Sequence, residues 1–235
     1  SQATSAPSLS GTITVGTGGT YNNLTLAIAA INSLGLSGPL QIQLIAGYPA
    51  AAETYPITFG ALAGISATNT VTVYPTVSGL SISSANTTAT IDLNASTYLT
   101  IDGRVNQTGA MDLIVANTST SGTAIRFINE AQNNRVFYCN VQGVNTSTTS
   151  GVILFSTTTG TNGNDGNRID NCNIRDGAST PTNGVYGAGT TTTSTYYNSS
   201  DTISNCNIFN FYNSSSTSLA GCGVNLSSGN TDWVI

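Results

Sequence analysis

A motif in the second half of the chain recurs at a nearly constant distance and constrains the fold more than any other feature. It reads RVFYCNV at 135–141, RIDNCNI at 168–174 and TISNCNI at 202–208, so its cysteines lie 33 and 34 residues apart. A glycine and a short apolar strand precede each copy, as in GVILF at 151–155. Repeats of this length are typical of solenoids, in which each unit buries its apolar face only against its neighbours.

The order of side chains within the motif predicts how the units stack. In the second copy, Ile169 and Ile174 are expected to face inward, while Asn171 occupies a bend because asparagine tolerates left-handed backbone. One predicted column is an interior stack of free, buried thiols, since in-register cysteines on parallel strands seldom reach disulfide geometry. The other is an outer ladder of stacked amides. The two columns contain Cys139, Cys172 and Cys206, and Asn140, Asn173 and Asn207, respectively. The pattern leaves the state of Cys222 open.

The N-terminal part of the chain has a different pattern, which predicts a strand, a helix and a second strand. Residues 11–15 and 41–47 alternate apolar and polar side chains, as half-buried strands do. The apolar stripe of the helix between them consists of Leu24, Ala27, Ile28 and Ile31. Asn22 or Asn23 is expected to cap the start of this helix, and Gly35 is expected to end it.

Together these patterns predict an all-β protein, namely a right-handed, single-stranded parallel β-helix (a solenoid) with a short N-terminal capping helix. The expected domains are a flexible segment at 1–10, a strand–helix–strand cap at 11–45 and the β-helix at 46–235. When the last residues are aligned with the motif, Trp233 falls opposite Ile203. The coil is therefore expected to end in the middle of a rung and to continue in a longer protein.

Three segments are expected to be loops that leave the coil on one side. A three-sided rung needs about 22–25 residues, so a repeat of this length leaves about ten residues outside the strands and bends. The candidate loops are 156–166, 187–200 and 213–218.

The composition excludes several chemistries. The chain has 235 residues, of which five are basic and ten acidic, and all five basic residues are arginines. Without histidine it has no imidazole base or metal ligand, and without lysine it has no Schiff-base residue. Five arginines make no basic stripe, so no nucleic-acid partner is expected.

The same composition suggests where the protein works. Charged residues are 6% of the chain, against about a quarter in a typical soluble protein. A surface of hydroxyls and amides suits an extracellular protein, so we expect a secreted protein, free or at the cell surface. The longest apolar stretch, 24–31, is too short to cross a bilayer. We expect no membrane insertion and no cofactor.

Several segments resemble a known family: GGTYNNLTLAIAAIN at 18–32, AGY at 46–48, YLTIDGR at 98–104, the Asn-Cys-Asn-Ile repeats and GNTDWVI at 229–235. The family is that of bacterial secreted, cell-surface right-handed parallel β-helix repeat proteins, of the kind exported by the type IX secretion system. The resemblance implies the fold but no single function, because such proteins include adhesins and sugar-active enzymes. The N-terminal part also resembles the capping end of pectin methylesterase-type β-helices, which implies that the helix covers the open end of the coil.

Three aspartates lie close together in the sequence and are the candidates for the acids of a glycoside hydrolase: Asp165, Asp170 and Asp176. Such an enzyme needs two carboxylates about 5–10 Å apart. The interpretation we favour is structural, with these aspartates placed in turns and paired with Arg168 or Arg175. No catalytic residue is therefore assigned.

Two further chemistries have partial signals. A β-elimination lyase could use an arginine as its base, and the candidates are Arg126, Arg135 and Arg168, although no aspartate cluster for calcium stands beside them. The segment with Asn162, Asn164 and Asp165 is rich in oxygen ligands but lacks the spaced acids and the final glutamate of a calcium loop. No metal site is expected.

Four tyrosines near the predicted loops are the candidate ligand-binding residues: Tyr186, Tyr196, Tyr197 and Tyr212. Together with Phe211 they are expected to cluster on the loop side, where aromatic rings beside amides and hydroxyls suit sugar stacking or a protein interface. The alternative is ordinary packing of the loops onto the coil, which we favour for Phe211.

The function expected from the sequence is that of an extracellular structural or adhesive module. Its expected partners are itself, another surface protein or extracellular glycans, and self-association into a larger assembly or filament is part of this expectation. Two alternatives stay open. One is a polysaccharide-active enzyme, either a glycoside hydrolase or a lyase, and the other is a passive glycan-binding β-helix.

Overall fold

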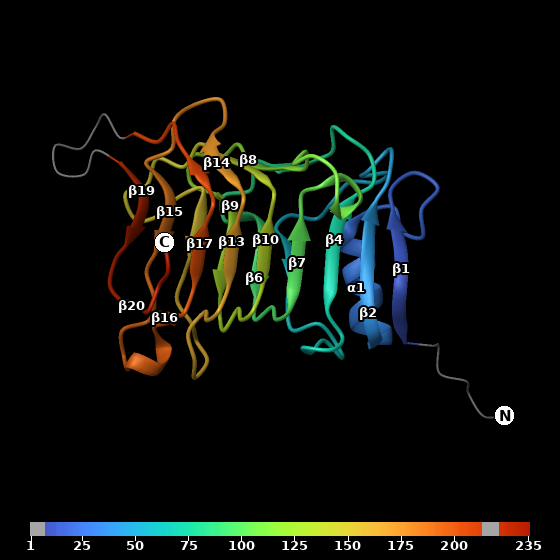
Figure 1. The fold of residues 1–235 in the computed structure, drawn as a ribbon, viewed down its shortest axis with the longest axis horizontal. Coiled ribbons are helices and arrows are strands. Elements are labelled where there is room, and N and C mark those ends of the chain that lie inside the picture. The colour runs from blue at the N-terminus through green and yellow to red at the C-terminus, as the bar shows by residue number, and fades with distance from the viewer. Residues whose placement is uncertain (1–7, 213–220) are drawn as a thin grey trace.

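The computed structural model describes residues 8–212 and 221–235. Their fold is an all-β parallel solenoid of about six turns (Figure 1), as the repeat predicts. Residues 1–7 of the expected flexible segment and the expected loop 213–218 lie outside the described residues. The right-handed sense of the coil and the capping role of the helix stay predictions.

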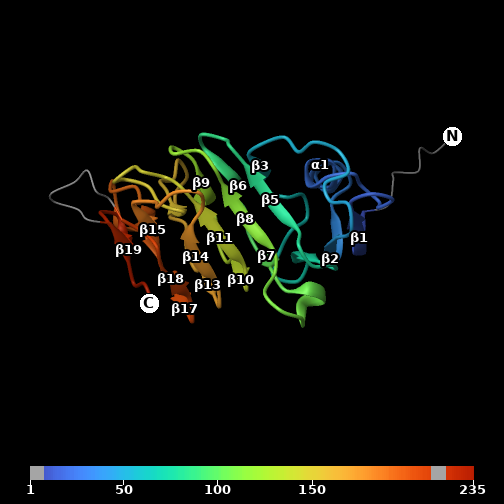
Figure 2. The same cartoon turned by 90° about the horizontal axis from the view of Figure 1, so that it is seen from above.

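Three parallel sheets form the sides of the coil. The seven-stranded sheet contains β1 (Leu9–Val15), β2 (Leu36–Leu44), β4 (Val71–Pro75), β7 (Leu99–Asp102), β10 (Arg135–Phe137), β13 (Arg168–Asp170) and β17 (Thr202–Ser204). The five-stranded sheet, which Figure 2 views from above, contains β5 (Ser81–Ser84), β8 (Ile114–Asn117), β11 (Asn140–Gly143), β14 (Asn173–Asp176) and β18 (Asn207–Ile208). The six-stranded sheet contains β3 (Ile57–Phe59), β6 (Ala89–Asn94), β9 (Thr123–Ile128), β12 (Ile153–Phe155), β15 (Asn183–Gly187) and β19 (Cys222–Leu226).

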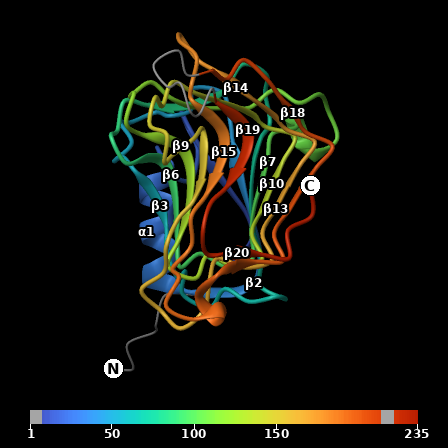
Figure 3. The same ribbon diagram turned by 90° about the vertical axis from the view of Figure 1, so that its left-hand side faces the viewer.

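From β4 onward, the chain visits the seven-, five- and six-stranded sheets in turn, so each turn adds one strand to each side. A small fourth sheet pairs β16 (Asn198–Ser199) with β20 (Asn230–Thr231). Apolar side chains from all three sides meet inside the coil. Figure 3 shows the backbone of these sides seen along the solenoid. Inside the coil, the rings of Phe127 and Phe155 stack with their centroids 4.3 Å apart.

The helix α1 (Leu24–Leu34) follows from its local sequence. The Asn23 side chain accepts a hydrogen bond from the Leu26 N–H at 2.9 Å, and Gly35, with a φ of 74°, ends the helix. The helix contacts β1 and also β3, which is the edge strand of the six-stranded sheet. It therefore lies on the same side of the coil as β3 and β6 (Figure 3). Within 8–212 and 221–235, no helix is long and apolar enough to span a membrane.

The predicted register of the last residues is wrong by two positions. Val234 pairs with Thr202, so Ile235 rather than Trp233 falls opposite Ile203. The physical reason is the indole ring, which packs edge-on against Phe155 with the ring centroids 4.7 Å apart. Its N–H also donates to the carbonyl of Asn198 at 3.2 Å, which ties the ring to the rung before it.

Candidate functional site

The motif cysteines lie in one column along the inside of the coil. The backbone N–H of Cys139 donates to Sγ of Cys172, and that of Cys172 donates to Sγ of Cys206, both at 3.4 Å. All four cysteines are free thiols; Cys139 and Cys172 are buried, whereas Cys206 and Cys222 are half-buried. The side-chain hydrogen bond between Cys172 and Cys139, together with burial, holds the pKa of Cys172 well above its usual value, although the backbone N–H of Cys139 acts to lower it. A thiol that stays protonated is a poor nucleophile, so this column is structural.

The motif asparagines form a ladder on the outside of the same turns. The amide of Asn173 donates to Oδ1 of Asn140 at 2.8 Å, and that of Asn207 donates to Oδ1 of Asn173 at 3.0 Å. The preceding bend residue has left-handed backbone, with a φ of 54° at Asn171 and 50° at Tyr138. This bend places each outer amide directly above the next.

A second ladder, which the sequence interpretation missed, lies inside the coil. Asn134, Asn167 and Asp201 are fully buried in successive turns. The amide of Asn134 donates to Oδ1 of Asn167 at 3.0 Å, and that of Asn167 donates to Oδ1 of Asp201 at 3.1 Å. The backbone N–H groups of Asn134 and Asn167 donate to the same two acceptors. The signal was in the sequence, because these residues directly precede the first residue of each motif copy.

Asp201 departs from this inner ladder because it carries a carboxyl where the other turns carry an amide. Its Oδ1 accepts both donors of Asn167, but among the described residues its buried Oδ2 has no hydrogen-bond partner. Burial raises the pKa of Asp201 well above its usual value, and the charge of Asp165 adds to the rise. The charged form of this carboxyl is therefore unfavourable, and the group is fully buried inside the coil.

The three candidate acids lie on different parts of the coil. Asp165 lies in the loop before β13, Asp170 ends β13 and Asp176 ends β14, in another sheet. Asp165 therefore lies before the start of β13, whereas Asp170 lies at its end.

Each candidate acid is also occupied by contacts within the coil. Oδ1 of Asp165 accepts from the N–H and the hydroxyl of Ser199 at 2.9 and 3.0 Å. Oδ1 of Asp170 accepts from Ser204 and Asn205, while Oδ2 pairs with Arg168 at 3.0 Å. Asp176 pairs with Arg175 through Oδ1, also at 3.0 Å. The pairing expected from the sequence is therefore present for both arginines.

The pKa shifts of two of these acids run in opposite directions. Burial raises the pKa of Asp165 above its usual value, despite the bonds from Ser199. Burial also acts to raise the pKa of Asp170, but the bonds from Asn205 and Ser204 and the charge of Arg168 outweigh it and leave the pKa lowered. Opposite shifts can mark an acid and a base, but here both carboxyls are held by contacts within the coil.

The loop at 156–166 is held by Glu130. One carboxylate oxygen of this residue accepts from the backbone N–H groups of Thr161 and Asn162 at 2.6 and 2.8 Å. These donors lower the pKa of Glu130. Asn164 is fully buried, and its amide donates to Oδ1 of Asn198 at 2.8 Å. The polar residues of the loop thus contact the coil, and within the described ranges no three potential metal ligands form a cluster.

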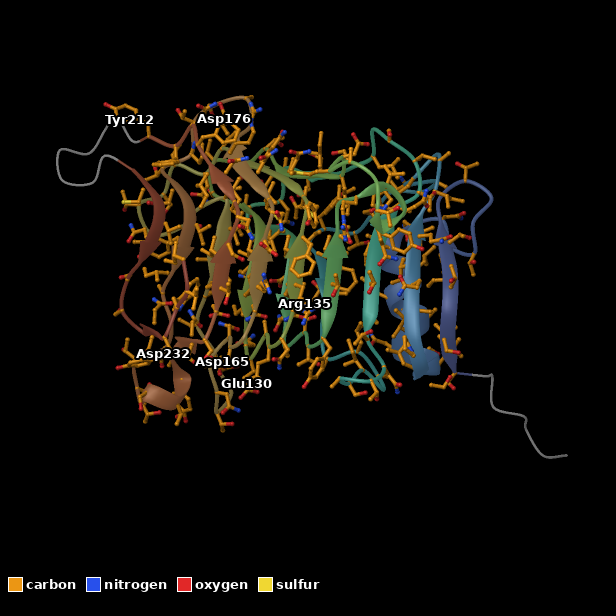
Figure 4. All side chains as sticks on the ribbon, viewed as in Figure 1. Glu130, Arg135, Asp165, Asp176, Tyr212 and Asp232 are labelled. Carbon is orange, nitrogen blue, oxygen red and sulfur yellow. The ribbon has the colours of Figure 1, made fainter. Side chains whose placement is uncertain are left out.

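The candidate tyrosines do not form the expected cluster. Tyr186 is buried in β15, and Tyr196 and Tyr197 lie at the short helix η2 (Ser194–Tyr196) just before β16. Tyr212 is 58% exposed and lies near Asp176 at the opposite end of the strands (Figure 4). The reason is topological, because Tyr196 and Tyr197 connect the six- to the seven-stranded sheet, whereas Tyr212 follows the five-stranded sheet. Phe211 packs against Gly223, 3.3 Å from the point where a Cβ atom would lie.

The arginines are divided four to one. Each of four forms an ion pair with a nearby aspartate: Arg104 with Asp102, Arg126 with Asp92, Arg168 with Asp170 and Arg175 with Asp176. Arg135 is exposed and forms no ion pair with any described residue. Its guanidinium carbon lies 5.8 Å from the ring centroid of Phe137, two residues further along β10.

Arg135 lines a groove of about 420 Å³ on the seven-stranded sheet. The other lining residues include Thr70, Tyr98, Thr100, Asn133 and Gly166. They lie in or just before β4, β7, β10 and β13, so the groove crosses four neighbouring strands near their N-terminal ends. Figure 4 shows Arg135 on this face, with Asp165 and Glu130 below it.

No protein-family model, curated protein or solved structure matches this chain significantly.

Proposed function

We propose that this chain is a structural, adhesive module of an extracellular protein, in which the solenoid acts as a stiff scaffold. The observation that carries the proposal is the use of the candidate acids. Asp165, Asp170 and Asp176 hold neighbouring turns or neighbouring residues through hydrogen bonds and ion pairs. Because these carboxylates already bind groups of the coil itself, they support a mechanical role rather than a catalytic one.

The polar ladders support the same role. The outer ladder of Asn140, Asn173 and Asn207 and the inner ladder that ends at Asp201 connect the same turns at two different places around the coil. Bending the coil at these turns would stretch both ladders and the strand pairing between them. The bonds of the inner ladder are strong because they lie in a medium of low dielectric constant.

The extracellular setting and the partners belong to the proposal. The low charge, the absence of lysine and the resemblance of the motifs to secreted, cell-surface β-helix proteins support them. The proposed partners are a second copy of the chain, another surface protein or an extracellular glycan. Export through a type IX secretion system is proposed from the resemblance alone.

Bead adhesion tests this function directly. Fluorescent beads that carry the purified chain are passed over a glycan array, over a surface coated with the same chain and over intact cells of the source organism. We expect retention on at least one surface, above that of beads coated with albumin. Beads that wash off all three surfaces like the albumin control would contradict an adhesive role. Labelling of intact cells with an antibody to the chain tests the location separately.

A digest of the same glycans tests the catalytic alternative. The wild-type chain and its Asp170→Asn variant are incubated with each polysaccharide, and the products are separated by size. We expect no shortened chains with either protein. Products that form with the wild type and disappear with Asp170→Asn would show a polysaccharide-active enzyme and would overturn a purely structural role.

A further inference from the structure

We propose that the groove beside Arg135 binds an acidic sugar residue of an extracellular polysaccharide, with the guanidinium against its carboxylate or sulfate group. The inference deepens the adhesive function proposed above and rests on it for its biological meaning. The binding itself is a separate property of the chain. Four features of the groove carry the argument: its free charge, its polar lining, the glycine that keeps it open and its acidic surroundings.

The free charge distinguishes Arg135 from its neighbour in the sheet. Arg135 and Arg168 occupy the same register position on β10 and β13. Both guanidinium groups lie about equally far from the ring of Phe137, at 5.8 and 5.9 Å. Only Arg168 is neutralised, by Asp170. Arg135 therefore has its forked donors available, and a carboxylate or sulfate matches that fork with two parallel hydrogen bonds.

The lining supplies partners for hydroxyl groups. Thr70 and Thr100 contribute hydroxyls, Asn133 contributes an exposed amide and Tyr98 contributes a half-buried ring with a phenol group. Hydroxyls and amides both donate and accept hydrogen bonds, and an aromatic ring suits the apolar face of a sugar. A volume of about 420 Å³ lies within the range of small-molecule sites, about 300–1,000 Å³.

The backbone keeps this groove open at its far end. Gly166 has a φ of 66°, and a Cβ atom there would lie 3.1 Å from Oδ1 of Asn133. A side chain at this position would crowd the exposed amide of Asn133. Glycine at this bend leaves room beside Asn133. The equivalent positions in the two preceding turns are occupied by Asn133 itself and by Tyr98.

The surroundings select the kind of anion. Arg135 is the arginine without an ion pair to a described residue, on a chain of net charge −5, and Asp165 directly precedes the lining residue Gly166. A polymer with dense charge, such as a nucleic acid or polyphosphate, would bring several anions near Asp165 and Glu130. One negative charge among many hydroxyls fits the groove better, and this is the chemistry of an acidic sugar residue.

Calorimetric titration of the purified chain tests the site with three probes. Hyaluronan oligosaccharides carry widely spaced carboxylates, κ-carrageenan oligosaccharides carry widely spaced sulfates, and dextran oligosaccharides are neutral. The variants are Arg135→Gln, the charge-conserving Arg135→Lys and, as a matched control, Arg175→Gln, which removes the same charge from another sheet. Circular dichroism melts establish that all variants are folded.

We expect the wild type to bind at least one acidic probe and not dextran. Arg135→Gln should weaken this binding at least about tenfold, as the loss of a charge-assisted hydrogen bond does. Arg135→Lys should bind with intermediate affinity, and Arg175→Gln within about twofold of the wild type. The probe that binds identifies the carboxylate or the sulfate as the recognised group.

Three results would overturn the inference: no binding of either acidic probe, equal binding by Arg135→Gln and the wild type, or equal weakening by Arg135→Gln and Arg175→Gln. These results are distinguishable from a failure of the proposed function. Adhesion that persists in Arg135→Gln beads would leave the adhesive role intact without this site. Probe binding without any bead adhesion would leave the site intact without the role.

Discussion

Replacing Asp201 with asparagine should stabilise the solenoid at neutral pH. Asp201 is fully buried, and its Oδ2 lacks a partner among the described residues. In the preceding turn, the amide nitrogen of Asn167 occupies the equivalent position and donates to the carbonyl of Ala131 at 2.8 Å. An asparagine at 201 would present the same donor and would complete the inner ladder.

The expected gain follows from the buried oxygen. Leaving a buried polar group unsatisfied costs about 1–3 kcal/mol, so the free energy of unfolding should rise by about this amount at pH 7. For a domain of this size, 1 kcal/mol corresponds to a shift of about 2–4 °C in Tm. We therefore expect Tm to rise by several degrees.

The pH dependence gives a sharper test. Burial raises the pKa of Asp201 in the folded state above that in the unfolded state, so the folded protein binds more protons. The free energy of unfolding of the wild type should then fall as pH rises above the unfolded pKa, about 3.9. Its slope from this residue is at most about 1.4 kcal/mol per pH unit. Asp201→Asn removes this contribution, so its advantage should shrink as pH falls from 7 toward 4.

Thermal melts at several pH values, followed by circular dichroism, measure both effects. Asp232→Asn is the matched control, because it removes the same charge from an exposed residue in the next turn. We expect that control to change Tm by less than Asp201→Asn at pH 7. An Asp201→Asn variant that is less stable than the wild type at pH 7, or whose advantage is the same at pH 4 and pH 7, would refute the reasoning.

Two other substitutions test the contacts that hold the turns. Glu53→Gln should lower the free energy of unfolding by about 1–2 kcal/mol, because the Glu53 carboxylate accepts hydrogen bonds from the N–H groups of Leu24 and Thr25 at the start of α1. Urea titrations measure this change, and an unchanged unfolding midpoint would contradict the prediction. Asn167→Ala should lower the free energy of unfolding by about 3 kcal/mol, and Asn173→Ala by about 1 kcal/mol or less. The reason is that the Asn167 amide is buried and makes four hydrogen bonds, whereas the outer Asn173 amide makes two. Equal losses would show that burial does not set the difference.

The repeat made much of the fold predictable. Because the motif of alternating apolar residues recurs every 33 or 34 residues, the chain has few ways to bury its strands except against the previous and the next turn. The capped helix was also predictable, because Asn23 and Gly35 have local conformational roles that need no tertiary context. Both inferences depend on neighbours in sequence or on an exact period.

The errors come from features that depend on space rather than on sequence distance. The last turn is shifted because the Trp233 ring fills the interior beside Phe155, and a motif alignment does not weigh ring volume. The tyrosines were grouped by their place in the sequence, yet Tyr197 and Tyr212 lie on connections at different corners of the coil. The inner ladder was overlooked because buried asparagine is uncommon, so Asn134 and Asn167 were not considered as core residues.

The distribution of charge explains how a chain of net charge −5 can present one cationic groove. Arg104 and Asp102 are two residues apart and Arg126 and Asp92 face each other across neighbouring strands, so each pair cancels within a few ångströms. At about 0.1 M salt, exposed charges further away than about 10 Å are largely screened. The potential in the groove is therefore set by Arg135 and its nearest acids rather than by the net charge of the chain. Because paired arginines cannot contribute a free cation, removing Arg135 alone should abolish the local attraction for anions.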